Sequence, residues 1–284
     1  MKTFSIKPAL NEKKEIIKCP VCGFDSFSKH WECDGFAYVR CRKCHLILQN
    51  PQPVFEDLDN RYSEEYFKYE QDNDQTFFDL MLKSLSDIDI NPNNFDSSEN
   101  RSFLDIGCAT GLLVEYFQKS GWMSRGVELC SPAAIYGSEL RLIDIFSGTV
   151  EQAAFKDETF DIIHCSHLIE HLNNPGSFMD EVYRILKPGG MFLCTTPNVS
   201  GFQAKLFQSK WRSSIADHMF LFSRKTLTKL FKNKNLSIRK IKTWGGLGQG
   251  YGPLWLKKVL DFSAKKLHFG DVMIISSEKN SLLK

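Results

Sequence analysis

The stretch RSFLDIGCATGLLVEYFQKS, residues 101–120, decides the fold that we expect for this chain. RSFLDIG predicts a strand and LLVEYFQKS a helix, and the turn between them contains Gly107, Ala109 and Gly111. Small residues in such a turn let a ligand approach the backbone and the N-terminus of the helix. An acid, Glu128, ends the next predicted strand, where its carboxylate is suited to accept hydrogen bonds from a ribose. The spacing GxAxG departs from the dinucleotide pattern GxGxxG, so the turn alone does not identify the ligand.

Strands and helices alternate beyond this turn. Such alternation implies right-handed crossovers and a parallel sheet that is covered on both faces. The predicted strands are SRGVEL, LIDIF, FDIIHCSH, GMFLCTTP, LSIRKIKTW and DVMIISSE, and the predicted helices are PAAIYGSEL, PGSFMDEVYRIL, SRKTLTKLFKNKN and PLWLKKVLDFSAKKL.

Two CxxC pairs precede this region, and they enclose 18 residues. The other five of the nine cysteines are scattered. In a reducing compartment the paired spacing indicates a metal site rather than disulfides, and it fits a tetrahedral four-thiolate zinc site of the ribbon type. Four thiolates leave no open coordination position, so the zinc is expected to be structural. His30 and His45 lie outside the knuckle spacing and are expected on the surface. The predicted zinc ligands are Cys19, Cys22, Cys41 and Cys44.

The order of these signals predicts a division of the chain. Pro51 and Pro53 end the cysteine-containing unit, and the apolar residues that follow recur at helical spacing on an acidic background. The stretch NPNNFDSSENR then marks the entrance to the next domain. We expect a loose tail (1–18), a small zinc-ribbon-like β unit (19–53), a helical connector or lid (54–99) and a main domain (100–284) with a basic part (200–284).

The composition is that of a globular protein: of 284 residues, 42% are hydrophobic and 25% are charged. No apolar run approaches the roughly 20 residues that span a bilayer, and the start MKTFSIKPAL lacks the apolar stretch of a signal peptide. We therefore expect a cytoplasmic protein.

Charge is distributed unevenly along the chain. Residues 1–199 hold 19 Lys and Arg against 30 Asp and Glu, a net charge of −11, whereas residues 200–284 hold 17 against 4, a net charge of +13. The basic excess indicates either a solvated surface or an anionic partner, namely a substrate, a membrane surface or a nucleic acid. Its predicted helix PLWLKKVLDFSAKKL either packs on the core with a solvated basic face, lies on an anionic membrane or covers the substrate pocket. That segment groups Trp255, Leu256, Val259, Leu260 and Phe262 with Lys257, Lys258, Lys265 and Lys266.

In their order, DIGCATG, RGVEL, FDIIHCSHLIEHL, LKPGG and MFLCTTPN resemble the successive motifs of class I S-adenosylmethionine-dependent methyltransferases. The resemblance covers residues 100–200 and, more loosely, the C-terminal strands. It implies an α/β, Rossmann-like fold with a mixed seven-stranded sheet, and S-adenosylmethionine as the cofactor. The residues that it implies for cofactor binding are Asp105, Gly107, Ala109 and Gly111 for the methionine part, Glu128 for the ribose, and Thr149 and Val150 for the adenine.

Three histidines and one acid are candidates for the acceptor side. His167, Glu170 and His171 share one face if a helix starts at HCSHLIEHL. The stretch is similar to one in ubiquinone-pathway O-methyltransferases, where this face carries ligands for a divalent metal. The alternatives are a metal-free active-site role for His171 or simple packing at a helix start. Its match to the inverted zinc-peptidase motif is disfavoured, because the sequence breaks at Asn-Asn-Pro. His218 precedes another predicted helix and is a candidate base, since a histidine at the matching place in related methyltransferases faces the acceptor.

The zinc knuckles, LILQNPQP and RYSEEYF together resemble, more narrowly, methyltransferases of bacterial surface-polysaccharide and other glycan or secondary-metabolite pathways. This resemblance implies O-methylation of a glycan or related small-molecule hydroxyl, with His218 or His171 as base. The acceptor is expected to be anionic or lipid-linked, so the protein is expected to associate peripherally with the inner membrane face. An RNA base methyltransferase is the first alternative, and a non-catalytic zinc-ribbon interaction protein is the second.

Overall fold

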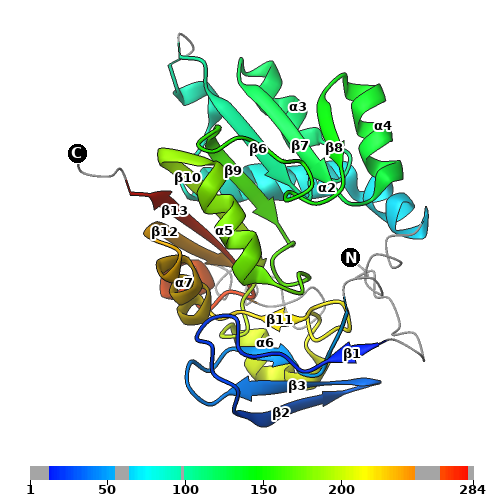
Figure 1. The fold of residues 1–284 in the computed structure, drawn as a ribbon, viewed down its shortest axis with the longest axis vertical. Coiled ribbons are helices and arrows are strands. Elements are labelled where there is room, and N and C mark those ends of the chain that lie inside the picture. Colours follow the sequence, from blue (N-terminus) through cyan, green and yellow to red (C-terminus); the bar gives the residue numbers. More distant parts are fainter. Residues whose placement is uncertain (1–12, 55–63, 97–98, 247–262, 281–284) are drawn as a thin grey trace.

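A computed structural model describes residues 13–54, 64–96, 99–246 and 263–280. Its centre is a seven-stranded sheet in the order β12-β13-β10-β9-β6-β7-β8 (Figure 1). The strands from β10 to β8 run parallel, and β13 is antiparallel to both β10 and β12. The predicted mixed, Rossmann-like sheet is thus confirmed. The strands are β6 (Ser102–Ile106), β7 (Met123–Glu128), β8 (Asp144–Ser147), β9 (Phe160–Ser166), β10 (Leu186–Pro197), β12 (Leu236–Trp244) and β13 (Val272–Lys279).

Helices cover both faces of this sheet. Successive side chains of a strand point to opposite faces, so neighbouring residues of each central strand pack in two different hydrophobic clusters. On β6, Phe103 packs with α2 and α3, whereas Leu104 packs with α5 and α7. Ile162 and Ile163 of β9 divide in the same way. None of the helices that the structure describes is long and apolar enough to cross a membrane. The helical elements are α2 (Glu64–Asp87), η1 (Pro92–Asn94), α3 (Leu112–Lys119), α4 (Ser131–Arg141), α5 (Pro175–Ile185), α6 (Phe202–Phe207), η2 (Gln208–Lys210) and α7 (Arg224–Asn233).

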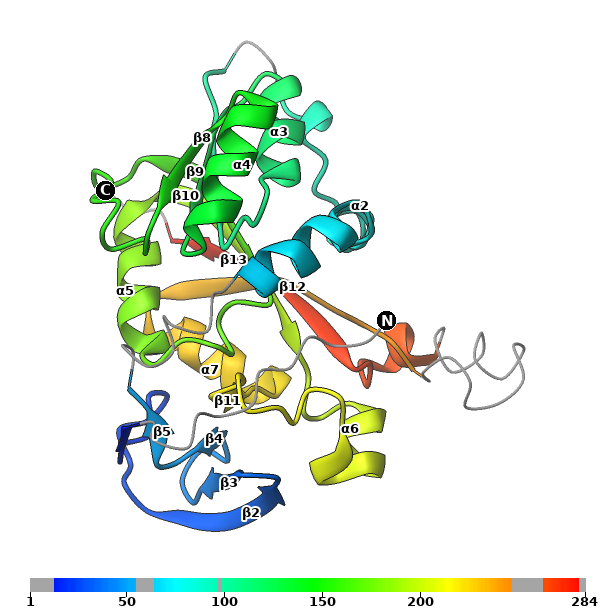
Figure 2. The same ribbon diagram turned by 90° about the vertical axis from the view of Figure 1, so that its right-hand side faces the viewer.

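The N-terminal cysteine unit is built on a second sheet in the order β11-β4-β3-β2 (Figure 2). Its strands are β2 (Phe27–Cys33), β3 (Phe36–Cys41), β4 (Ile47–Gln49) and β11 (Phe220–Leu221), so one strand comes from the C-terminal third of the chain. The chain order CPVCGFDSF and then YVRCRKCHLILQNPQP predicts two short hairpins with a CxxC in each turn. The second CxxC does join β3 to β4, whereas the first precedes β2 and is not the turn of a paired hairpin. Within the expected loose tail, β1 (Lys14–Glu15) pairs with β5 (Gln52–Pro53).

The helical connector predicted after the cysteine unit is present as α2, which passes beside α3 and α4 (Figure 2). Most of the predicted basic helix, including Trp255, Lys257 and Lys258, lies outside the described residues, and residues 263–267 are helical. Within that piece, Lys265 Nζ lies 2.8 Å from a carboxylate oxygen of Asp87 at the end of α2. This lysine is therefore engaged in an intramolecular ion pair.

Candidate functional site

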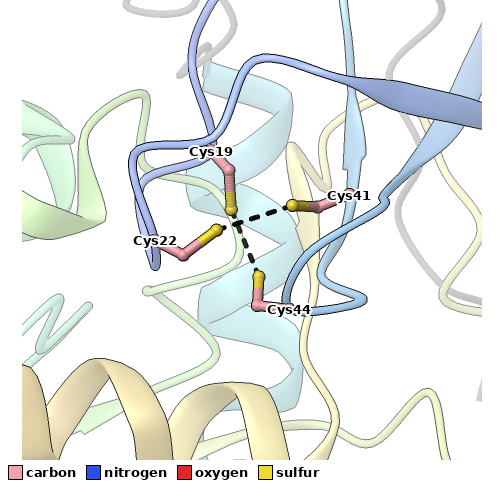
Figure 3. Close-up of side chains that lie close together, drawn as sticks. All are labelled: Cys19, Cys22, Cys41 and Cys44. Carbon is pink, nitrogen blue, oxygen red and sulfur yellow. Dashed lines mark hydrogen bonds between the residues drawn. The ribbon is translucent and has the colours of Figure 1, made fainter.

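The four knuckle cysteines converge on one point (Figure 3). Their sulfur atoms all lie within 4.8 Å of one another, with 3.4 Å between Cys19 and Cys44 and 3.6 Å between Cys22 and Cys41. A tetrahedral zinc ion with sulfur ligands at about 2.3 Å requires sulfur separations of roughly 3.8 Å, so this donor set fits zinc. The backbone curls around each pair: the N–H of Gly23 donates to Cys19 O, and the N–H of His45 donates to Cys41 O.

The glycine-rich turn and Glu128 form one hydrogen-bonded unit at the carboxyl ends of β6 and β7. The Ala109 N–H donates to Glu128 Oε2, and the Cys130 N–H donates to Oε1, both at 2.8 Å. Glu128 is 4% exposed, and burial raises the pKa of its carboxyl. Gly111 has a φ of +79° at the N-cap of α3, a conformation that L-residues rarely adopt. The hydrogen bond from Ala109 to the Glu128 carboxylate therefore holds the glycine-rich turn against the end of β7.

A cavity of about 1190 Å³ opens above this unit. The same cavity is also lined by His167, His171 and His218, so one space joins the predicted cofactor and acceptor groups. Thr195 also lines the cavity, and its buried Oγ1 has no hydrogen-bond partner among the residues that the structure describes. The predicted cofactor residues that line it are Asp105, Gly107, Ala109, Glu128, Thr149 and Val150.

Asp105 has a partner that the sequence did not reveal. Its Oδ1 lies 2.7 Å from Nδ1 of His164, whose side chain is fully buried in β9. The available signal was a histidine inside the apolar run FDIIHC, but the run does not say which residue of β6 lies opposite. The pair is a consequence of the parallel register of β6 and β9, which places Asp105 beside His164.

Helix α2 contributes acids to the cavity that sequence reasoning also missed. Thr110 Oγ1 donates to Asp74 Oδ1 at 2.6 Å, and Arg141 Nη2 lies 2.7 Å from Asp74 Oδ2, so α2 is tied to the glycine-rich turn and to α4. Glu70 also lines the cavity, where burial and the nearby charge of Glu128 raise its pKa to about 7. Glu70, when ionised, suits a cationic ligand, whereas Asp74 already pairs with Arg141.

The expected helical face at His167, Glu170 and His171 is wrong. Residues 168–171 form a turn, and α5 begins only at Pro175 behind its N-cap Asn174, because a proline fits the first turn of a new helix and not its interior. Nδ1 of His167 lies 3.2 Å from Glu170 Oε1. The His167 side chain is 49% exposed, whereas that of Glu170 is buried.

A different group gathers instead: Glu170, His171 and His218 offer ligand atoms within 4.8 Å of one another. The rings of His171 and His218 meet edge to face with their centres 4.6 Å apart. Nδ1 of His218 lies 2.8 Å from Ser213 O, and burial lowers the pKa of this imidazole to about 3, so it is neutral at pH 7. Burial disfavours the charged form of Glu170, but the hydrogen bond from His167 and the nearby imidazoles hold its pKa at about 2.

Comparison with known proteins identifies related chains. Residues 54–241 match a family model described as a methyltransferase domain. Similar curated proteins include the ubiquinone biosynthesis O-methyltransferases of Maricaulis maris (35% identical over 106 residues, 35% of this chain and 42% of the relative) and of Alkalilimnicola ehrlichii (33% over 124 residues, 39% and 50%). The chain thus spans half or less of the length of these relatives.

Solved structures that share the fold include the following two. One is a chain from the complex between the Haloferax volcanii Trm112 methyltransferase activator and a methyltransferase, with a TM-score of 0.59, 13% identity, and coverage of 78% of this chain and 97% of that chain. The other is an S-adenosylmethionine-dependent methyltransferase from Thermotoga maritima, with a TM-score of 0.51, 19% identity, and coverage of 76% and 98%.

Proposed function

Because this chain belongs to the methyltransferase domain family, we propose that it is an S-adenosylmethionine-dependent methyltransferase that methylates a hydroxyl group of a small-molecule acceptor. One observation carries the proposal: a single cavity is lined both by the turn that Glu128 holds and by His167, His171 and His218. The names of the curated relatives, O-methyltransferases of ubiquinone biosynthesis, support a hydroxyl acceptor.

The residues of the cofactor side suit S-adenosylmethionine in shape and charge. The bare turn at Gly107 leaves room for a ligand at the backbone, and Glu128 retains lone pairs beyond the two that its backbone bonds use. Glu70 adds negative charge to the cavity wall when it is ionised, whereas the charge of Asp74 is balanced by Arg141. Bound S-adenosylmethionine supplies a methyl group on a positively charged sulfur, which ionised Glu70 favours electrostatically.

On the acceptor side, we assign proton acceptance to His171. His171 and His218 both line the cavity and lie beside ionised Glu170, but a base with a pKa near 3, such as His218, is a weak proton acceptor for a hydroxyl. Positive charge that develops on His171 is stabilised by that carboxylate. His218, held neutral, orients the His171 ring.

A divalent metal is the second candidate for activating the acceptor hydroxyl. Glu170, His171 and His218 combine one carboxylate with two imidazoles, a donor set that suits such ions. Both oxygens of Glu170 already have partners, His167 Nδ1 and Thr196 Oγ1, so the carboxylate has to share its lone pairs with an ion. Activity that is lost on chelation and restored by Mg²⁺ supports this candidate.

Zinc at the four knuckle cysteines is proposed as a structural metal. The converging sulfurs support it, and the donor set leaves no open position for a substrate. The glycan acceptor and its anionic or lipid-linked character are supported by the sequence resemblance and by the basic C-terminal part, as is a peripheral membrane contact.

The experiment that tests the function is methyl transfer from labelled S-adenosylmethionine to a panel that contains a catechol, a sugar nucleotide, a lipid-linked sugar and structured RNA. We expect transfer to a hydroxyl acceptor, and a loss of roughly a hundredfold in turnover on replacing His171 by Ala with unchanged cofactor affinity. Transfer to RNA alone supports the RNA methyltransferase alternative. Calorimetry that detects no cofactor binding supports the non-catalytic interaction protein.

A further inference from the structure

The N-terminal cysteine unit contacts the segment that carries His218. Residues 213–218 form a loop that ends at His218, whose ring contacts the ring of His171. The chain then continues into β11, which pairs with β4 through Phe220 and Leu48. The backbone N–H of Gln49 also donates to Met219 O at 2.9 Å. The loop is therefore attached to the N-terminal sheet at its exit.

Two side chains of that sheet hold the loop itself. The Tyr38 hydroxyl lies 3.0 Å from Ile215 O and 2.9 Å from His218 O, so its single proton is shared between these two carbonyls. The Gln49 amide donates from Nε2 to Ala216 O and to His218 O, each at 2.9 Å. The carbonyl of His218 thus accepts from both strands. Because buried carbonyls need hydrogen-bond donors, removing the Tyr38 hydroxyl or the Gln49 amide takes a donor from backbone carbonyls of the loop.

The two donors act together because Tyr38 and Gln49 are direct cross-strand partners in the register of β3 and β4. Both are almost completely buried, with 1% and 3% exposure. β3 ends at Cys41, and the turn from Cys41 to Cys44 that leads into β4 carries half of the cysteine cluster. The cysteine cluster therefore stabilises the turn that sets the relative position of the two donors.

From these contacts we propose that the N-terminal cysteine unit is a positioning device for the acceptor side, in which Tyr38 and Gln49 hold the 213–218 loop so that the His218 ring stays against His171. The inference rests on the proposed function in that His171 is taken as the base. The cofactor turn is held by other groups, Glu128 and Asp74. The unit therefore governs turnover and not cofactor binding.

The test compares Tyr38→Phe and Gln49→Met, each of which removes donors with little change in volume, with the control Val39→Ala. Val39 is the neighbour of Tyr38 on β3 and packs against the main core, so its truncation weakens the same unit and leaves both donors in place. The readouts are hydrogen exchange of the amides of 215–221, the affinity for S-adenosylmethionine by calorimetry, and kcat and KM with the best hydroxyl acceptor of the panel.

We expect both donor variants to speed exchange in 215–221 and to lower kcat about tenfold or more, since small displacements of reacting groups are costly, with cofactor affinity unchanged within about twofold. Val39→Ala should lower the unfolding temperature without either change. Equal effects of Val39→Ala, or parallel losses of kcat and cofactor affinity, overturn the inference. If the wild type methylates no panel member, the proposed function fails, while unchanged exchange in the donor variants separately refutes the positioning role.

Discussion

Replacing Glu128 by Gln tests the cofactor side of the cavity. Both carboxylate oxygens accept backbone N–H groups at 2.8 Å, one from Ala109 and one from Cys130. A glutamine side chain keeps one oxygen, and its NH₂ group then faces a backbone donor. The backbone N–H of Ala109 or Cys130 then loses its acceptor in a buried site, where Glu128 is 4% exposed. We expect the free energy of unfolding to fall by about 1 to 3 kcal/mol, the cost of one unsatisfied buried donor.

Cofactor affinity should fall separately. If the remaining lone pairs of Glu128 accept ribose hydroxyls, losing the charge costs about 1.5 to 3 kcal/mol of binding, which is roughly a tenfold to hundredfold rise in Kd. Titration calorimetry with S-adenosylmethionine measures this change, and urea denaturation measures the stability. Exposed Glu151, which lines the same cavity, provides the control Glu151→Gln with an expected change below about twofold.

An unchanged Kd for Glu128→Gln, with the fold intact, would remove Glu128 from the cofactor site. If Glu128→Gln and the Glu151→Gln control lose the same affinity, direct hydrogen bonds from Glu128 to the cofactor are refuted, because the loss then reflects only the net charge of the cavity. Loss of stability without loss of affinity would limit Glu128 to bracing the turn.

Three further changes have expected outcomes. The carboxyl of Glu70 has a pKa raised to about 7, so its contribution to stability is complete below its ordinary value of 4.5 and is lost as pH rises through 7. A cationic ligand favours the ionised form of Glu70, so S-adenosylmethionine should bind more tightly as pH rises from 5 to 8. In calorimetry, Glu70→Gln should flatten this pH dependence. Gly111→Ala places a Cβ against Ile143 Cδ1 at a φ of +79° and should lower the free energy of unfolding by about 2 to 4 kcal/mol in urea denaturation. Gly121→Ala, where the Cβ meets open space, should cost only the backbone part, about 1 to 2 kcal/mol. Cys41→Ser should abolish the one zinc per chain that elemental analysis is expected to find, and Cys33→Ser should retain it; wild-type protein without zinc would contradict the site.

The sequence by itself determined the elements and the local motifs. The seven strands of the main sheet and helices α3, α4, α5 and α7 follow from short-range periodicity, since each repeats its apolar positions within a few residues. The short elements α6, η2 and β11 are not predicted, because they are too short to show a period. The knuckle pairs and the turn from Gly107 to Gly111 are equally local, because a spacing of two to four residues controls where their side chains point. Glu128 was found for the same reason: it ends the strand next to the turn in sequence as well as in space.

Only the tertiary structure decided which distant side chains meet. Glu70 and Asp74 reach the cofactor side because α2 packs beside α3 and α4, and a helix pattern does not say which neighbour it packs against. The helix that would bring His167, Glu170 and His171 onto one face is absent, because residues 168–171 form a turn and the i, i+3, i+4 spacing alone does not specify a helix. His218 joins Glu170 and His171 because β11 pairs with the N-terminal sheet. Pairing between segments so far apart in the chain has no periodic signature, since its free energy depends on the packed surfaces and not on the spacing of residues along either segment.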